Sequence, residues 1–443
     1  MEVTLQQILD FREQRAKQQK ALLARFHCPL ICFTMNIAGP VKVSPLILRA
    51  FQWGLAQLDS RLDSAKLLYR QAETPMTGCQ AFYAVASDAS ELKQICTAIE
   101  EQTPLGRLFD MDVLDCGGNK LERGYPRSCI VCGAPGRACA AGRLHSVEKL
   151  QAATGCMISE HFATFDRERI AALAVQSLLE EVKTTPKPGL VDCRNTGSHT
   201  DMDADTFIVS ANALQPYFEK CVKIGQSTAL LPPYETFPAL RKAGLEAEKA
   251  MYRATKGINT HKGAIYTMGI LCGSLGRLWK PEEPIAETGA VLSLCAEMTA
   301  QAVKADFAGM TGATAGERLF LQKGLTGIRG QMAAGLPAVV NIGLPVFERC
   351  LEKGLSPNDA GAITLVHLIA HVEDTNLYHR GGNAGAAFAR NAAQALLPDP
   401  TLAQIEKLDD AFISRNLSPG GCADLLAASY FLRHLQEIDD PES

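Results

Sequence analysis

Apolar and polar positions follow two different patterns along this chain, and the change falls near residue 165. Before that point, apolar positions at helical spacing predict helices over 4–25, 45–69 and 88–101, the last capped by Asp88. Short apolar runs between them predict buried strands over 30–39, 79–87 and 105–115. Helices that alternate with strands predict an α/β domain, which we place at residues 1–164.

After residue 165, Ala, Leu, Glu and Lys dominate and strand signals nearly vanish. Helical period and length predict helices over 168–183, 238–254, 286–305, 332–353, 357–373, 384–396, 400–415 and 421–437. The predicted fold is therefore multidomain, with a larger all-α helical domain over 165–443.

Composition narrows the class of protein. Of 443 residues, 47% are hydrophobic and 21% charged, and the net charge is −4, so neither nucleic acid nor an anionic membrane is an expected partner. The sequence has no apolar run of bilayer length and no signal-peptide pattern at its start, so we expect a cytoplasmic protein. The fifteen cysteines are mostly scattered among apolar neighbours, which favours buried free thiols over a disulfide framework.

The stretch Pro186–Asp203 is too rich in proline, glycine and polar residues for a helix or strand. We therefore predict a loop. Long loops inside compact domains usually bind or catalyse, and the alternative is a surface linker.

Three more glycine-bearing segments, read as loops, resemble it: 259–269, 324–331 and 373–385. Each of the four couples a basic residue to glycines near a predicted helix start, which is how proteins bind phosphate. The sequence contains neither a P-loop nor a dinucleotide-binding glycine motif, so we expect a polyphosphate site of another kind. The candidate binding residues are Lys187, Gly189, Lys262, Gly263, Arg329, Gly330, Arg380, Gly381 and Gly382.

Acids and histidines accompany these cations. Asp192, Asp203 and Asp374 are candidates for holding Mg²⁺ or for acting as a general base toward a hydroxyl, and for Asp192 and Asp374 helix capping is the alternative. His199 and His261 are candidate catalytic groups because both lie in glycine-bearing segments beside Asp or Lys. His367 and His371 stand one helical turn apart, a spacing that more often reflects packing than metal binding.

In the first half, Asp110 and Asp112 lie two residues apart in a predicted strand, so both side chains point to one face. Paired carboxylates of this kind hold Mg²⁺ in enzymes that displace pyrophosphate. The alternative is two solvated acids on an exposed strand.

Cys129, Cys132, Cys139 and His145 have the spacing C-x₂-C-x₆-C-x₅-H. Thiolates and an imidazole at such intervals fit a structural Zn²⁺ site. The alternative is a reduced, glycine-rich segment whose arginines contact phosphate.

These motifs resemble two protein families. The first half resembles the phosphoribosyl-dephospho-CoA transferase that modifies citrate lyase, through PLICFTMNIAGPVK at 29–42, GRLFDMDVLD and the segment PRSCIVCGAPGRACAAGRLH at 126–145. The second half resembles triphosphoribosyl-dephospho-CoA synthase, through PKPGLVDCRNTGSHTDMD, NTHKGA, GLTGIRGQ, DTNLYHRGGNAG and RNLSPGGCADLLA at 415–427. Together the resemblance covers almost the whole chain.

The resemblance implies a bifunctional transferase. Its second half would join ATP to 3'-dephospho-CoA with loss of adenine, and its first half would transfer the product to a serine of the apo acyl carrier subunit of citrate lyase, releasing pyrophosphate. It also implies a nucleotidyltransferase-like first domain with Asp110 and Asp112 as the Mg²⁺ pair, beside Gly106 and Arg107. The alternatives are a chain with one active half and one docking module, or a non-catalytic scaffold that binds CoA-like ligands.

Overall fold

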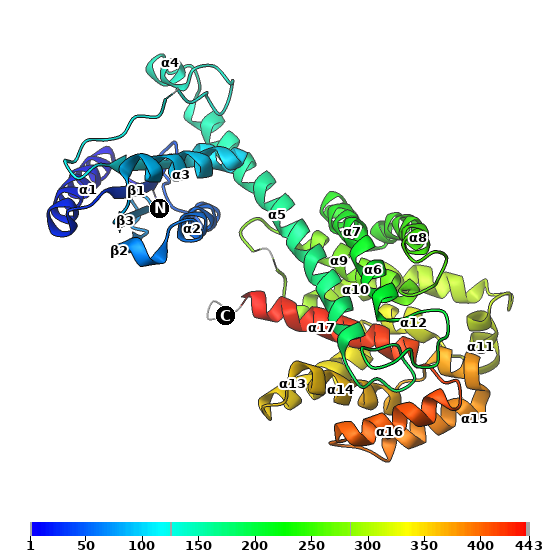
Figure 1. The fold of residues 1–443 in the computed structure, drawn as a ribbon. Coiled ribbons are helices and arrows are strands. Elements are labelled where there is room, and N and C mark those ends of the chain that lie inside the picture. Colours follow the sequence, from blue (N-terminus) through cyan, green and yellow to red (C-terminus); the bar gives the residue numbers. More distant parts are fainter. Residues whose placement is uncertain (1, 125, 284, 440–443) are drawn as a thin grey trace. The chain divides into compact units, whose positions relative to one another are not determined.

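The computed structural model describes residues 2–124, 126–283 and 285–439 and divides into two compact units, Met1–Phe165 and Asp166–Ser443 (Figure 1). The division falls inside one helix, α5 (Val147–Lys183).

The first unit is built on one small sheet. Its strands are β1 (Leu30–Met35), β2 (Leu67–Glu73), β3 (Gln80–Val85) and β4 (Phe109–Leu114). They run in the order β2-β3-β1-β4, and each neighbouring pair is antiparallel. The strand β4, which carries Asp110 and Asp112, therefore lies at an edge of the sheet.

Helices cover both faces of this sheet. They are α1 (Leu5–Phe26), α2 (Pro45–Asp59) and α3 (Ala89–Gln102), with 3₁₀ turns at Ser64–Lys66 and Pro104–Leu108 and a short helix, α4 (Gly136–Ala141). On one face, Leu22 of α1 packs on Cys32 and Phe82. On the other, the Phe33 ring packs at a tilt on Phe51 of α2 and edge to face on Phe109.

Sequence predictions in this unit are wrong at two strand ends and over one helix. The strand expected over 30–39 ends at Met35, and the one expected over 105–115 begins at Phe109, after a 3₁₀ turn. The helix expected over 45–69 ends at Asp59, and Leu67–Glu73 forms the strand β2. Side chains of β2 alternate between partly buried and exposed positions, and its polar residues hide that alternation in the sequence. The helix predicted after Asp88 is confirmed: Asp88 caps α3 through the Ser90 amide at 2.8 Å.

The described residues of the second unit form helices and connecting loops and no strand, apart from an isolated bridge between Lys280 and Glu283. Besides the end of α5, its helices are α6 (Ala204–Ala213), α7 (Gln215–Thr228), α8 (Thr236–Ala254), α9 (Lys262–Leu278), α10 (Thr288–Ala308), α11 (Ala315–Lys323), α12 (Gly327–Ala333), α13 (Leu344–Glu352), α14 (Pro357–His371), α15 (Thr375–Gln394), α16 (Leu402–Ile413) and α17 (Gly420–Asp439). A 3₁₀ turn at Pro233–Glu235 and a π-helix at Val339–Gly343 complete it.

Glycines let the central helices of this unit approach closely. A Cβ on Gly225 of α7 would stand 2.1 Å from the Gly273 carbonyl oxygen of α9, and one on Gly276 would stand 2.1 Å from the Val222 carbonyl oxygen. Because the two backbones touch, no larger residue fits at either position. Two helices, α9 and α14, are buried along most of their length and form the centre of the core.

Three segments predicted as loops prove to be largely helical. Residues 259–269 enter α9 at Lys262, residues 324–331 enter α12 at Gly327, and residues 373–385 lie mostly in α15. The glycines that indicated loops serve close packing in α9, and Gly382, at φ 57° and ψ −158°, breaks α15 in its middle. The single helix expected over 332–353 is divided by a turn after α12 and by the π-helix before α13. Pro186–Asp203 is confirmed as a loop between α5 and α6.

Over the described residues, no helix is long and apolar enough to cross a membrane.

Candidate active sites

In the first unit, Asp110 and Asp112 share one face of β4, as predicted, while Phe109, Met111 and Val113 are buried on the other. The register places Asp110 opposite Thr34 and Asp112 opposite Cys32, on the face that α1 covers. Lys120 Nζ lies 2.6 Å from Asp112 Oδ1, and the charge of Asp110 also acts on Lys120. The arrangement offers two partly exposed carboxylates beside a cation.

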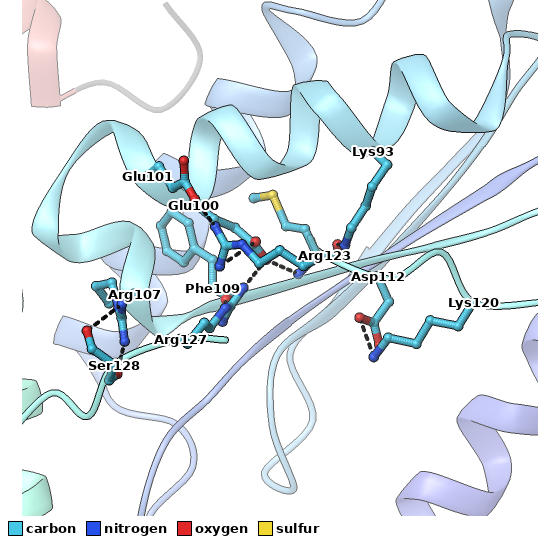
Figure 2. Close-up of polar contacts among 11 residues, drawn as sticks. Lys93, Glu100, Glu101, Arg107, Phe109, Asp112, Lys120, Arg123, Arg127 and Ser128 are labelled. Atoms are coloured by element: carbon cyan, nitrogen blue, oxygen red, sulfur yellow. Dashed lines mark hydrogen bonds and ion pairs between the residues drawn. The ribbon is translucent and has the colours of Figure 1, made fainter. Parts of the chain in front are cut away.

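A second charged cluster supports the start of β4 (Figure 2). The Glu100 carboxylate, 1% exposed, accepts the Met111 amide at 2.8 Å and pairs with Arg123 and Arg127. Arg127 also donates to the Phe109 carbonyl at 2.6 Å. Since a buried carboxylate is stable only when paired and hydrogen-bonded, the two arginines fix the loop after β4 to the sheet.

Gly106 and Arg107 lie in the 3₁₀ turn just before β4. A Cβ on Gly106 would stand 2.5 Å from the Glu100 carbonyl oxygen, so the glycine allows this turn to pack on the end of α3. Arg107 donates to the hydroxyl of Ser128 at 3.0 Å and to its carbonyl oxygen, which Figure 2 shows as the outer edge of the cluster. Burial and the neighbouring Arg127 lower the pKa of Arg107.

The structure brings together the four predicted zinc ligands. One ligand atom from each of Cys129, Cys132, Cys139 and His145 lies within 4.8 Å of the others.

In the second unit, Lys187 is turned inward. Its Nζ lies 2.6 Å from Glu181 Oε1 and 2.8 Å from the Glu181 carbonyl oxygen, and the two side chains are 1% and 7% exposed. A buried ion pair of this kind requires both partners, because either charge alone would be strongly destabilised.

Carboxylates hold the loop Pro186–Asp203 in shape. Asp192 accepts the amides of Lys187, Arg194 and Asn195 at 2.8 to 2.9 Å. Asp409 of α16 accepts the Gly189 amide at 2.8 Å, and Gly189, at φ +70°, packs against the Leu417 carbonyl. At the end of the loop, Asp203 caps α6 through the Thr206 amide at 2.9 Å.

Arg380 of α15 joins this loop to two other segments. It donates to the Ser198 carbonyl at 2.8 Å and to Asn416 Oδ1 at 2.9 Å, and its Nη2 lies 3.2 Å from His199 Nδ1. His199 Nε2 lies 3.1 Å from Ser418 Oγ. Burial and the charge of Arg380 lower the pKa of His199, so this imidazole is held in its neutral form.

His261, at the start of α9, is 3% exposed. Its Nδ1 lies 2.8 Å from Ser210 Oγ, and its Nε2 is buried without a hydrogen-bond partner among the described residues. Burial, together with the charge of Lys187, lowers the pKa of His261 to about 3. The ring is therefore neutral, and one of its nitrogens is buried with no hydrogen-bond partner among the described residues.

Asp374 is the cap of α15 and also reaches α17. Its Oδ1 accepts the Asn376 amide at 2.7 Å, and its Oδ2 accepts the Cys422 amide at 2.8 Å. The side chain is 3% exposed, and burial raises its pKa. Capping, the alternative for this residue, is thus observed, at a position that also borders a cavity.

Asp424 was missed as a site residue in the sequence. Its partly buried carboxylate lies against Gly263 and accepts the Ala264 amide. Burial first, then the charges of Glu181 and Asp374, raise its pKa well above the usual range. The sequence contains one indication of it. Asp424 is a single acid near the start of an otherwise apolar helix, CADLLAASYF, and acids are rarely placed in such buried stretches without a specific role.

The second unit also contains two cavities of about 430 Å³ each. The first is lined by Thr326, Asp374 and Gly421, among others. The second is lined by Lys262 and Arg329 together with acids, including Glu248, which lies 3.1 Å from Lys262 Nζ. The predicted segments at 259–269 and 324–331 therefore share one cavity, and those at 324–331 and 373–385 share the other.

The remaining predicted glycines pack closely. A Cβ on Gly330 would stand 1.9 Å from Thr326 Oγ1, and one on Gly381 would stand 2.4 Å from Leu417 Cδ2. The histidines His367 and His371 are engaged in packing, as expected: His367 Nε2 lies 2.7 Å from the Pro398 carbonyl, and His371 Nδ1 lies 2.9 Å from the His367 carbonyl.

A short segment, residues 416–425, contacts three of the four predicted segments and lines the first cavity together with the fourth, 324–331. The Ser198 hydroxyl donates to the Leu417 carbonyl at 2.7 Å, Asn416 and Ser418 contact Arg380 and His199, and Asp424 and the Cys422 amide contact Gly263 and Asp374. One charged and glycine-lined site therefore assembles around the start of α17.

The two units carry separate polar clusters, one with paired carboxylates on a sheet edge and the other with cations and acids among helices, and this arrangement fits a two-domain transferase. The comparisons agree. A family model described as apo-citrate lyase phosphoribosyl-dephospho-CoA transferase matches residues 3–161, and one described as ATP:dephospho-CoA triphosphoribosyl transferase matches residues 167–443. The chain belongs to the family of proteins that fuse these two.

Curated relatives extend over both halves. A protein of Haemophilus influenzae named Protein CitXG is 36% identical over 97% of this chain and 96% of its own length, and one of the same name from Leuconostoc mesenteroides is 32% identical over 98% and 97%. A Vibrio cholerae protein named probable 2-(5''-triphosphoribosyl)-3'-dephosphocoenzyme-A synthase is 42% identical over 62% of this chain and 91% of its own length.

Proposed function

We propose that this chain is a bifunctional transferase that makes the prosthetic group of citrate lyase and attaches it. The observation that carries the proposal is that two family models with consecutive activities cover separate parts of one chain, residues 3–161 and 167–443. We assign attachment to a domain at residues 1–164 and synthesis to a domain at residues 165–443.

In the first reaction, ATP and 3'-dephospho-CoA give 2'-(5''-triphosphoribosyl)-3'-dephospho-CoA and adenine. The 2'-hydroxyl oxygen of dephospho-CoA bonds to the ribose C1' of ATP, the bond from C1' to adenine breaks, and the hydroxyl loses its proton. The reaction therefore needs a base near the hydroxyl and cations on the triphosphate.

We assign the base to Asp424. Burial and the charges of Glu181 and Asp374 raise its pKa, which makes this carboxylate a better proton acceptor than an ordinary surface acid. His261, neutral and with Nε2 free, would accept a hydrogen bond from the same substrate. Asp192 and Asp203 support the loop and α6 beside this site.

Lys262 and Arg329 are proposed to bind the triphosphate. They line one cavity, and both side chains are about half exposed, so they are open to a ligand. Arg380 and His199 would contact the remainder of the substrates from the neighbouring loop. Lys187, held by Glu181, would act on the site through its charge and not by direct contact.

In the second reaction, a serine hydroxyl of the apo acyl carrier subunit attacks a phosphorus of the triphosphate chain and pyrophosphate leaves. Asp110 and Asp112 present oxygen donors on one face of β4, which fits Mg²⁺. Bound there, the ion would neutralise charge on the leaving pyrophosphate. Gly106 and Arg107 lie at the start of the same strand, and we assign a nucleotidyltransferase-like fold to this domain.

The substrates are thus ATP, 3'-dephospho-CoA and the apo acyl carrier subunit, with Mg²⁺ as cofactor. We place the protein in the cytoplasm, where ATP and CoA compounds are available, with neither nucleic acid nor membrane as partner.

The full chain tests both activities. Incubated with ATP, Mg²⁺ and 3'-dephospho-CoA, it should release adenine, and omission of dephospho-CoA should prevent that release. Addition of the apo acyl carrier subunit should then give a covalent adduct, measured by mass, and pyrophosphate. Formation of ADP or AMP instead of adenine would contradict the first assignment, and adenine release without an adduct would limit activity to one half of the chain.

A further inference from the structure

The segment between β4 and α5 has almost no hydrophobic core. Among the described residues of 116–150, Cys139 is the one buried side chain, and Val131 and Leu144 are 36% and 64% exposed. Figure 1 shows α4 and its loops standing outside the sheet and its covering helices, at the start of α5. A segment of this size cannot hold one conformation by apolar burial, so it needs a cross-link such as a disulfide or a bound metal ion.

Four side chains that can bind a metal ion lie together inside this segment. The Sγ atoms of Cys132 and Cys139 lie 3.4 Å apart, and His145 Nε2 lies 3.3 Å from Cys132 Sγ. Together with Cys129, all four ligand atoms lie within 4.8 Å of one another. In a tetrahedral site with Zn–S bonds of about 2.3 Å, sulfur atoms stand about 3.8 Å apart, so the cluster has nearly the size of a zinc tetrahedron.

The backbone around the first two cysteines is also shaped for a metal ligand. The Val131 amide points at Cys129 Sγ at 3.4 Å, and the Cys132 amide does the same. The turn closes through Gly133, at φ +75°, whose amide donates to the Cys129 carbonyl at 3.0 Å. Amides directed at sulfur stabilise a thiolate, which is the form that binds zinc.

The same segment is fastened to the strand that carries Asp110. Arg127 and Ser128, immediately before Cys129, contact Glu100, Phe109 and Arg107 in the cluster of Figure 2. The Gly136 amide, at the start of α4, donates to the Arg127 carbonyl at 2.9 Å. Whatever fixes the cysteine cluster therefore also fixes Arg127 and, through Ser128, Arg107.

We propose that Cys129, Cys132, Cys139 and His145 bind one Zn²⁺ ion, which folds the segment 126–146 and holds Arg127 and Ser128 against the start of β4. Four protein ligands close the coordination sphere, so the ion is structural and takes no part in the chemistry. A disulfide is the competing cross-link. It would join only two of the four residues, and the 3.4 Å between the Cys132 and Cys139 sulfurs exceeds the bonded distance of about 2.05 Å.

Metal analysis of the full chain tests the site independently of either activity. Protein purified without chelator should contain one equivalent of zinc per chain, and Cys132→Ser should contain about tenfold less or lower still, because a structural site needs all four ligands. Cys156→Ser is the matched control, since Cys156 is exposed and contacts Glu160 outside the cluster. It should keep its zinc.

Proteolysis gives a second readout on the unaltered chain. Arg137 and Arg143 are exposed within the segment, so trypsin should cut there much faster after a strong chelator removes the metal, and added zinc should restore resistance. The proposal fails if the purified chain, after equilibration with zinc and dialysis, holds no zinc. It also fails if mass analysis finds Cys132 and Cys139 joined in a disulfide, or if chelation leaves the cleavage rate unchanged.

Discussion

The carboxylate of Asp424 lies directly against Gly263: a Cβ built on residue 263 would stand 1.8 Å from Asp424 Oδ2. Gly263 is the second residue of α9, and Asp424 lies near the start of α17. The two helices thus meet where a glycine leaves room for a carboxylate. The position of this carboxylate, which we propose as the base, depends on the absence of a side chain at residue 263.

Gly263→Ala should therefore displace Asp424. We expect adenine release to fall by about 10²-fold, since a shift of about 1 Å in a catalytic group has that effect. The free energy of unfolding should fall by about 1–3 kcal/mol because the methyl group overpacks the contact. Adenine release by chromatography and urea unfolding measure the two effects.

Gly289→Ala, in α10, is the control for this substitution. A Cβ there meets no atom within 4 Å, so activity should be unchanged and stability equal or slightly higher. If Gly263→Ala behaves like Gly289→Ala, the contact with Asp424 has no importance for the reaction.

Asp424→Asn should abolish most of the adenine release, by about 10²- to 10⁴-fold for loss of a general base. The pH dependence gives a sharper test. A base works when deprotonated, and burial with Glu181 and Asp374 raises the pKa of Asp424, so the wild-type rate should rise with pH through that raised pKa. Asp410→Asn, an exposed acid of α16, should keep the wild-type profile. An unchanged profile in Asp424→Asn would assign the base elsewhere.

Asp110→Asn should separate the two activities. We expect adenine release to stay at the wild-type level, while labelling of the apo acyl carrier subunit falls by at least about 10²-fold, because one Mg²⁺ ligand is lost. Asp88→Asn is the matched control, since Asn caps α3 nearly as well as Asp. Loss of both activities in Asp110→Asn would contradict the division into two independent sites.

Lys187→Met should destabilise the second unit by about 3–5 kcal/mol, because it leaves the Glu181 carboxylate buried without its partner. The double variant Lys187→Met with Glu181→Leu should regain part of that stability, since it removes both charges. Chemical unfolding of the wild type, the two single variants and the double variant gives the coupling free energy between Lys187 and Glu181. Additive effects of the two single substitutions would show that the ion pair contributes little.

His434 and Glu180 join α17 to α5, with Nε2 2.7 Å from Oε2. The hydrogen bond to Glu180 raises the pKa of His434, while the pKa of Glu180, which burial alone would raise, is lowered overall by its bonds to His434 and Gln176. A histidine whose pKa is higher in the folded than in the unfolded protein stabilises the fold at pH values below its unfolded-state pKa. This stabilisation is lost as the pH rises through its folded-state pKa.

His434→Gln should therefore lose stability relative to wild type near pH ~6, and the difference should shrink as the pH approaches ~9. Urea unfolding at a series of pH values measures it. A difference that grows toward alkaline pH would contradict the assigned sign.

Many of the helices and strands of this chain can be predicted from local sequence patterns. The cap at Asp88, the buried run at 79–87 and the alternation that places Asp110 and Asp112 on one face depend only on residues close in the chain. The strand β2 was missed because its half-buried pattern carries polar residues. It becomes a strand through pairing with β3, a contact that local sequence does not encode.

The helix α9 was missed for a related reason. Its glycines indicate a loop when taken alone, yet Gly273 and Gly276 are what allows α7 and α9 to touch backbone to backbone. Burial in the core outweighs the low helix propensity of glycine, which costs only about 1 kcal/mol per residue.

The sequence by itself determined which residue types form the second site: cations with glycines, acids, and two histidines, spread over four segments. Only the tertiary structure decided how they meet. The loop Pro186–Asp203 looked like the centre of this site, but residues 416–425 contact three of the four segments, share a cavity with the fourth and contribute Asp424. Contacts between helix ends far apart in the chain depend on packing of the whole core, and that packing leaves no periodic signal in the sequence.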